Sequence, residues 1–364
     1  MLVFISSAAQ AADCPAAGKA MRDALALKMG TPEAEASFRR AIELCPELSE
    51  AHYNLALSLL ESGRAADAIL AVTQAIKLKQ DANFYVALGN AQVMQSDLSS
   101  AERAYDQAVK LSPENAKALQ GLSAVYLRNG NATQAEEVLR RAVQISPDDA
   151  AVFFNLGLIL EQAGRLDEAA ESYRAAVERD SASSGAYTRL GGTLARLGKL
   201  DEAERALRSA TLHAPNDAAV WLALAAILER KKDFAEGFTA VERARLLAPD
   251  SADVAVSRGI LLIKQGLFDE GLVVLLQTSK RYPDLAAAHA ALGWGQLQNK
   301  DLVSAEASLQ KALELNSGDA LSLNNLGVLF QLKGQPEQAQ RAFERAKALA
   351  PNLDAAKSNL SAAH

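Results

Sequence analysis

Apolar residues along this chain recur at spacings of three and four positions, which is the period of an amphipathic helix. The pattern continues over nearly the whole chain, in segments of helical length that glycine or proline interrupts. Glycine can adopt the positive φ that ends a helix, and proline cannot continue one. The pattern therefore predicts an all-helical chain built from short helices.

A small residue, usually preceded by leucine, recurs along the chain at a nearly constant interval. The step is 33 residues once and 34 residues after that. These ladder positions are Ala56, Gly89, Ser123, Gly157, Gly191, Ala225, Gly259, Gly293 and Gly327. A second small residue follows each of them twelve positions later, and a larger apolar residue comes soon after it. One earlier unit fits before Ala56, so the interval predicts ten units of two amphipathic helices each.

The small residues suggest how the units pack. Helices approach closely only where side chains are small, and larger apolar residues fill the grooves beside them. A single hairpin cannot bury its own apolar face, whereas a stack of hairpins can. We therefore expect ten hairpins over residues 12–353 and a C-terminal capping helix over residues 354–364. Glycine stands at the turn of most units, and we expect small changes of twist where Ser96, Lys232 and Lys300 replace it.

The repeated unit resembles the tetratricopeptide repeat family, from about Pro15 to the C-terminus. The residues that match the family motif are Asn155-Leu156-Gly157, Ala203, Leu207, Ala210 and Pro215. The resemblance implies an all-α fold, a right-handed α-solenoid (superhelix), in which the first helix of each unit lines the concave face. It also implies that a protein or peptide partner binds along that face.

The same resemblance implies which side chains face the groove, because the residue two before each ladder position should point into it. With the aromatic and basic residues on the same face, the predicted groove residues are Tyr53, Asn54, Arg128, Phe154, Asn155, Arg189, Arg196, Trp294 and Asn325. An asparagine amide can both donate to and accept from a peptide backbone, and exposed aromatic side chains anchor interfaces. The alternative is that the asparagines cap or solvate the helices and the aromatics pack between them.

The main binding hypothesis places an extended partner segment across the units of Gly157 and Gly191. Phe154 would be its apolar anchor and Asn155 would hold its backbone. The three predicted arginines, Arg128, Arg189 and Arg196, would supply positive charge. The chain as a whole has a formal net charge of −6. A local charge of opposite sign favours a segment rich in Asp or Glu.

Charge and composition argue against several other functions. Acidic and basic residues are interspersed, so the sequence has no basic stripe that would bind the phosphate backbone of a nucleic acid. No apolar run approaches the roughly 20 residues that span a bilayer. The four histidines lie in different units without other ligands at metal-binding spacing, and no catalytic constellation is present. The sequence therefore predicts a non-enzymatic protein without metal or cofactor.

Two features at the N-terminus indicate an exported protein. Residues 1–11 are apolar and end in the small residues Ala9-Gln10-Ala11, like the end of a secretory signal without its basic region. The alternative is a simple apolar arm. Cys14 and Cys45 flank the first hairpin at ends that antiparallel helices bring together, which predicts a disulfide and an oxidising compartment. The alternative is two free thiols on a cytosolic protein.

The second helix of one unit is apolar around more of its circumference than stacking requires. Leu272, Val273 and Leu276 there predict a surface for self-association or a second partner, the alternative being a locally thicker core. Taken together, the sequence favours a periplasmic or secreted scaffold used in envelope assembly, secretion or export. The alternatives are a cytosolic interaction module for signalling or chaperones, and the repeat arm of an enzyme.

Overall fold

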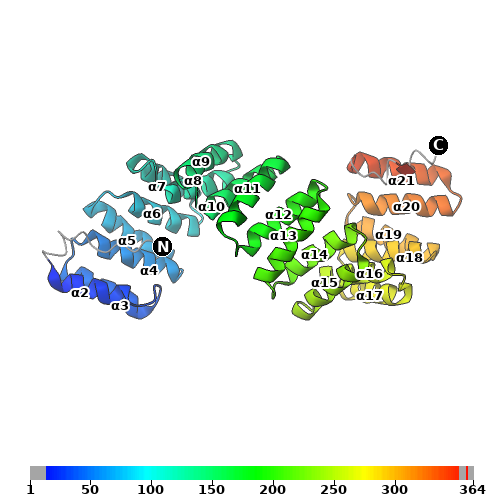
Figure 1. Ribbon diagram of the computed structural model, residues 1–364, viewed down its shortest axis with the longest axis horizontal. Helices are drawn as coiled ribbons and strands as arrows, with labels where there is room; N and C mark the ends of the chain where they lie inside the picture. Colours follow the sequence, from blue (N-terminus) through cyan, green and yellow to red (C-terminus); the bar gives the residue numbers. More distant parts are fainter. Residues whose placement is uncertain (1–13, 352–357, 360–364) are drawn as a thin grey trace. The chain divides into compact units, whose positions relative to one another are not determined.

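A computed structural model describes residues 14–351 and 358–359 of the chain. In these residues all regular secondary structure is helical, and the helices follow one another as antiparallel pairs (Figure 1). The chain divides into two compact units, Met1–Ser181 and Ala182–His364, with five helical hairpins described in each. The all-α repeat architecture predicted from the sequence is confirmed. The expected N-terminal arm at residues 1–11 lies outside the described residues, as does all of residues 354–364 except Ser358 and Asn359.

The helices are 11 to 14 residues long. Those of the first unit are α2 Pro15–Leu25, α3 Pro32–Leu44, α4 Ser49–Glu61, α5 Ala65–Leu78, α6 Ala82–Met94, α7 Leu98–Leu111, α8 Ala116–Arg128, α9 Ala132–Ile145, α10 Ala150–Gln162 and α11 Leu166–Arg179. Those of the second unit are α12 Ser184–Arg196, α13 Leu200–His213, α14 Ala218–Arg230, α15 Phe234–Leu247, α16 Ala252–Lys264, α17 Phe268–Arg281, α18 Ala286–Gln298, α19 Leu302–Leu315, α20 Ala320–Leu332 and α21 Pro336–Leu349.

The ladder positions mark where the two helices of a hairpin touch. In the hairpin of α10 and α11, a Cβ atom built on Gly157 would lie only 2.6 Å from Cε1 of Tyr173. In the hairpin of α20 and α21, a Cβ on Gly327 would lie 2.4 Å from Cε1 of Phe343. Both rings are fully buried, so they cannot move aside. The small residue is therefore required because the second helix places a bulky apolar side chain against it.

The turn inside each hairpin uses a residue in the left-handed conformation. Six turn glycines predicted to cap the first helices all have positive φ: Gly63, Gly130, Gly164, Gly198, Gly266 and Gly334. Ser96, Lys232 and Lys300 adopt the same conformation, with φ of 62°, 65° and 61°. The turn is thus unchanged where glycine is replaced, and the side chain carries the steric cost instead.

A polar contact between successive hairpins recurs in the same register. A glutamate near the start of a second helix binds the residue that ends the first helix of the next hairpin. The pairs are Ser62 with Glu35 (3.2 Å), Asn129 with Glu102 (3.2 Å), Lys231 with Glu204 (2.6 Å) and Lys333 with Glu306 (2.6 Å). Each contact ties the turn of one hairpin to the helix before it.

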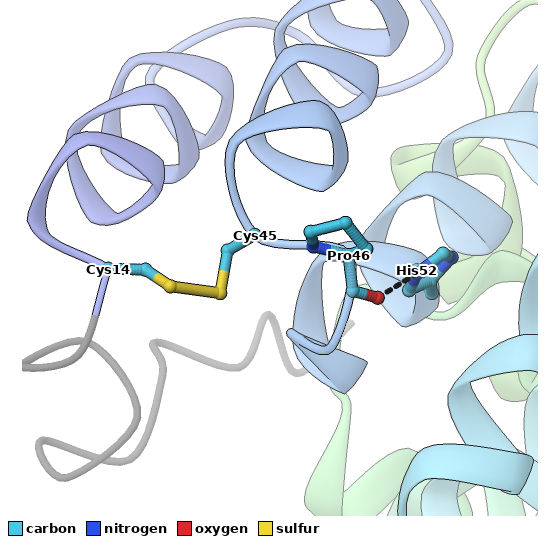
Figure 2. Close-up of a disulfide and its surroundings, with 4 residues drawn as sticks. All are labelled: Cys14, Cys45, Pro46 and His52. Atoms are coloured by element: carbon cyan, nitrogen blue, oxygen red, sulfur yellow. Dashed lines mark hydrogen bonds between the residues drawn. A yellow bond between two sulfur atoms is a disulfide. The ribbon is translucent and has the colours of Figure 1, made fainter.

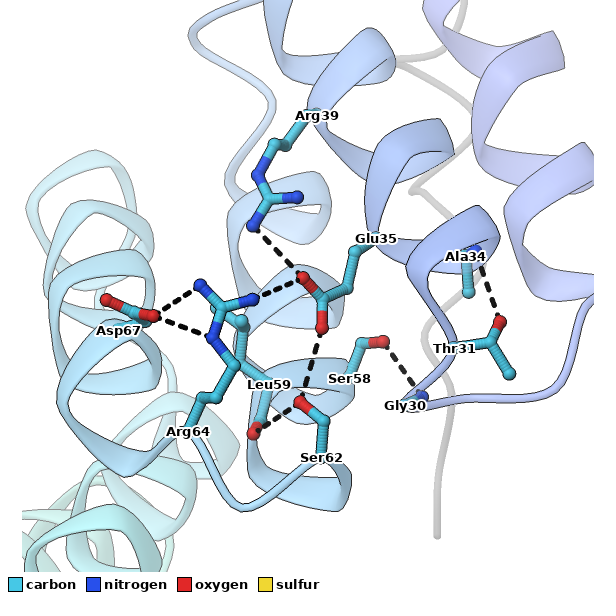
Figure 3. A network of polar contacts seen from close by, with 10 residues as sticks. All are labelled: Gly30, Thr31, Ala34, Glu35, Arg39, Ser58, Leu59, Ser62, Arg64 and Asp67. Carbon is cyan, nitrogen blue, oxygen red and sulfur yellow. Dashed lines mark hydrogen bonds and ion pairs between the residues drawn. The ribbon is translucent and has the colours of Figure 1, made fainter.

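The most extensive of these contacts surrounds Glu35, which is only 5% exposed (Figure 3). Arg39 and Arg64 donate to Oε2 of Glu35 at 3.0 and 2.9 Å, and Ser62 donates to Oε1. Arg64 also binds Asp67 through its Nε at 2.8 Å. A buried carboxylate is stable only when it is paired and hydrogen-bonded. Because the groups that satisfy Glu35 come from α3 and from the ends of α4 and α5, the network joins these three helices.

Two adjacent glycines of α12 provide a matched test of the ladder contact. A Cβ on Gly191 would lie 2.6 Å from Cγ of the buried Leu207, whereas a Cβ on Gly192 would meet nothing within 4 Å. We expect Gly191→Ala to destabilise the protein by about 1–3 kcal/mol through overpacking. Gly192→Ala should instead stabilise it by roughly 0.5–1 kcal/mol through helix propensity. Urea unfolding of both variants measures the difference, and equal effects would contradict the packing role.

The left-handed lysine at position 300 provides a second test. Lys300→Gly should raise the free energy of unfolding by about 1 kcal/mol, because glycine adopts positive φ without the steric cost that a Cβ imposes. Gly198→Ala, at the matching turn of α12 and α13, is the reverse control and should destabilise the protein. Thermal unfolding compares the two, and a destabilised Lys300→Gly would refute the idea that the turn is strained.

Candidate functional site

The first helices of the second unit line a cavity of about 550 Å³. Its lining comes from α16, α18 and α20, with Glu229 of α14 at one edge. Trp294 of α18 and Asn325 of α20, both predicted from the sequence as groove residues, are part of it. Each of these two side chains is half-buried, so part of each faces the cavity.

The cavity exists because α18 is rich in alanine on this face. Ala287, Ala290 and Ala291 line it. Ala290 occupies the register position that Phe154 occupies in α10, four steps of 34 residues earlier. The missing bulk leaves an apolar hollow beside Trp294, which Val256 and others extend.

The edge of this cavity carries charge. Lys264 of α16 donates to Oε1 of Glu229 at 2.6 Å, and its Nζ lies 5.8 Å from the centre of the Trp294 ring. Asp319 begins α20, where its Oδ1 accepts from the backbone N–H groups of Leu321 and Ser322. The site therefore combines an apolar floor with an ion pair and a carboxylate at its edge, a composition typical of a binding groove.

A smaller cavity of about 410 Å³ lies on α4, α6 and α8 of the first unit. Its polar groups include Asn83 and Asn90. The hydroxyl of Tyr105 donates to Oδ1 of Asn90 at 2.6 Å, and Asn115 donates to Oδ1 of Asn83 at 3.3 Å. Both asparagine carbonyl oxygens thus accept a hydrogen bond from within the protein.

Tyr53 and Asn54, two of the predicted groove residues, are buried in the first unit, although Tyr53 also lines the cavity of about 410 Å³. Asn54 is 0% exposed and Tyr53 is 5% exposed. The ring of Tyr53 lies 4.8 Å from that of Phe84 on the next first helix, which is the packing role named as the alternative. Burial, with the charge of Asp81, raises the pKa of Tyr53 to about 12.

The remaining predicted groove residues lie on first helices of both units. Phe154 and Asn155 of α10 are half-buried, and the Phe154 ring lies 5.8 Å from that of Tyr173. Arg128 of the first unit is exposed, as are Arg189 and Arg196 of the second. Their assembly into one site across the Gly157 and Gly191 hairpins stays a prediction.

One important site residue was missed in the sequence. Lys264 follows its ladder position by five residues, as Arg128 and Arg196 do. Applying the same spacing of five residues to the ladder position Gly259 would have identified Lys264 as a basic residue on this face of α16.

The predicted disulfide pair lies at the first hairpin (Figure 2). Cys14 directly precedes α2 and Cys45 directly follows α3, and the structure joins them with their Cα atoms 6.1 Å apart. Nearby, the His52 ring contacts the carbonyl oxygen of Pro46 at 2.9 Å. The bond links the start of the described chain to the end of its first hairpin.

The predicted contact surface on α17 is partly exposed. Val273 and Leu276 are exposed, whereas Leu272 packs against the core residues Ile263 and Leu275. Its use for self-association stays a prediction.

Residues 14–351 and 358–359 contain no group of three or more metal-ligating side chains and no helix long and apolar enough to cross a bilayer.

Stacked helical hairpins with grooves on their first helices define a helical-repeat scaffold. Models described as tetratricopeptide repeat match residues 30–83, 86–150, 134–184 and 256–320 in one case, 160–227 in a second and 308–341 in a third. These matches cover more than half of the chain. The chain belongs to the tetratricopeptide repeat family.

Similar proteins of known structure support the fold. A tetratricopeptide repeat protein from Parabacteroides merdae ATCC 43184 is 18% identical, with a TM-score of 0.64 over 68% of this chain and 98% of that one. Yeast Tom70 is 16% identical, with a TM-score of 0.50 over 91% of this chain and 84% of that one.

A short sequence match links the chain to a bacterial protein. Cellulose synthase operon protein C of Komagataeibacter xylinus is 41% identical over 69 residues, which is 19% of this chain and 5% of that protein. The chain thus matches only a small part of the length of this relative.

The disulfide provides a test of the first hairpin. Protein isolated from an oxidising compartment should contain no free thiol, and Cys45→Ser should destabilise the first hairpin by about 2–4 kcal/mol, since the bond closes a loop of 31 residues. Thiol counting under denaturing conditions and hydrogen exchange in α2 and α3 measure these effects. Exchange in α18 is the control and should not change. Two free thiols in such material would contradict the prediction.

Proposed function

We propose that this chain is a non-enzymatic scaffold that holds an extended segment of a partner protein against the first helices of its second unit. Tetratricopeptide repeats are protein–protein interaction scaffolds, which supports the general role. The observation that carries the specific site is that Trp294 and Asn325, both predicted from the sequence as groove residues, line one cavity of about 550 Å³.

The cavity suggests how a segment is held. Its alanine-lined floor accepts one apolar side chain of the partner against Trp294, where burial of apolar area supplies the affinity. Asn325 can both donate to and accept from the backbone of that segment, which fixes its direction without requiring a particular sequence. The Lys264–Glu229 pair at the edge favours polar groups on either side of the anchor.

We also propose that two further helices contribute to binding, each within its own unit. Phe154 and Asn155 of α10 in the first unit offer an apolar anchor and an amide. Arg189 and Arg196 of α12 in the second unit offer exposed positive charge, which suits a segment rich in Asp or Glu.

We further propose that the protein acts in the bacterial cell envelope, as a periplasmic or secreted component of assembly, secretion or polysaccharide export. The Cys14–Cys45 pair and the signal-like residues 1–11 support an oxidising compartment. The name of the relative, which refers to a cellulose synthase operon, is consistent with polysaccharide export.

Partner capture tests the groove. Trp294→Ala should weaken binding of the native partner by about 2 kcal/mol, which is typical of a central aromatic anchor. Adding Asn325→Ala to this variant should weaken binding further. The measurement is a pull-down from the native host with the purified chain, followed by titration of the captured partner.

The matched control is Leu212→Ala, which truncates an exposed apolar residue on the second helix α13. It should leave capture unchanged. Unaltered affinity in Trp294→Ala, together with lost binding in Leu212→Ala, would show that the protein recruits partners through its second helices.

A further inference from the structure

Arg258 on α16 breaks a rule that the rest of the chain follows. It directly precedes a ladder position. The residue at this place is Met21 in the first hairpin and leucine in the other eight: Leu55, Leu88, Leu122, Leu156, Leu190, Leu224, Leu292 and Leu326. Seven of these leucines are buried. One hairpin therefore carries a guanidinium group where all the others carry an apolar core residue.

The Arg258 guanidinium is compensated by a carboxylate from the preceding hairpin. Its Nε donates to Oε1 of Glu242 on α15 at 2.5 Å, and the Nε of Arg245 donates to Oε2 of the same carboxylate at 2.8 Å. Burial favours the neutral acid, but the two arginines outweigh it and lower the pKa of Glu242. One ionised carboxylate is thus shared by two cations, which leaves an excess of positive charge.

Arg245 and Arg258 line a cavity of about 230 Å³ where α15, α16 and α17 meet, helices that follow one another in Figure 1. A third guanidinium, that of Arg281 at the end of α17, also lines it and binds the exposed Asp250 at 2.5 Å. Ser251, which caps the start of α16, completes this edge. Three guanidinium groups therefore line the cavity, and they are paired with two carboxylates, those of Glu242 and Asp250.

The hydrogen-bonding capacity of two of these arginines is largely unspent. Within the described residues, Arg245 and Arg258 donate hydrogen bonds only through Nε, and their terminal amino groups make none. Guanidinium groups bind carboxylate and phosphate oxygens through such paired N–H groups. The cavity is also smaller than the roughly 300–1,000 Å³ of pockets that enclose whole ligands. It fits a single small anionic group.

We propose that this cavity binds one oxyanion, a carboxylate or a phosphate group, presented by a molecule that docks on the second unit. The cavity shares no lining residue with the Trp294 cavity, although α16 contributes to both. It is therefore a second recognition point, independent of the first-helix groove. Its charge also differs from that of the protein as a whole, which is acidic.

The experiment titrates the full chain at low salt with two probes, inorganic phosphate and glutarate. Binding is followed by NMR shifts of the arginine Nε–Hε groups and by calorimetry. Both probes carry the proposed chemistry, and the tighter one tells whether a phosphorylated or an acidic group is preferred. We expect saturable binding that weakens as salt rises.

The decisive variant is Arg258→Leu, which restores the leucine of the other hairpins and should therefore fold. It should lower the affinity for the preferred probe by at least about tenfold, as expected when a charge-assisted hydrogen-bond donor is lost. Arg208→Leu is the matched control. It also removes one ion-paired guanidinium group, because Arg208 on α13 pairs with Glu204 and Glu236. It should leave the affinity unchanged.

Several outcomes would overturn the proposal. These are no binding of either probe to the wild-type chain, unaltered binding in Arg258→Leu, or an equal loss in Arg208→Leu. A rise in stability of Arg258→Leu without a change in anion binding would show that Arg258 serves only its pair with Glu242. If Arg258→Leu does not fold, Arg281→Gln replaces it, and wild-type affinity in that variant would equally reject the site.

Discussion

The structure depends on one contact, that between a small residue of each first helix and a bulky apolar side chain of the helix that follows. Gly157 and Tyr173 show its geometry, because no Cβ fits between them. Close approach of the two helices lets the bulky side chain reach the interior, where neighbouring hairpins cover it. The turns, the contacts between hairpins and the grooves on the first helices all take their positions from this pairing.

This dependence explains why the fold could be predicted from the sequence. The contact recurs from hairpin to hairpin, so from Ala56 onward it leaves a small residue at each step of 33 or 34 and a bulky residue at a fixed distance after it. Turn glycines such as Gly198 followed from the same period, and even Lys300 adopts the left-handed conformation of the glycine it replaces. A constraint that is repeated along a chain is visible within that chain alone.

The candidate site was harder to predict because a groove depends on the sizes of side chains on several helices at once. Trp294 and Asn325 both line a cavity, but the space beside them comes from alanines of α18. The side chain of Asn54 is covered in the folded unit, which register alone does not show. Arg258 was overlooked for a related reason, since a departure from the repeat has meaning only after the other hairpins show what the repeat requires.

The glutamates that bind the ends of the next first helices give the chain a direction. In each pair the acceptor belongs to the earlier hairpin and the donor to the later one, as with Glu35 and Ser62 or Glu204 and Lys231. A ribosome delivers the chain from its N-terminal end, and folding during synthesis follows that order. Where a second helix carries this glutamate, the hairpin already made therefore presents a carboxylate to the turn that emerges next. Successive hairpins can therefore dock in the order in which they are synthesised, from the N-terminus to the C-terminus.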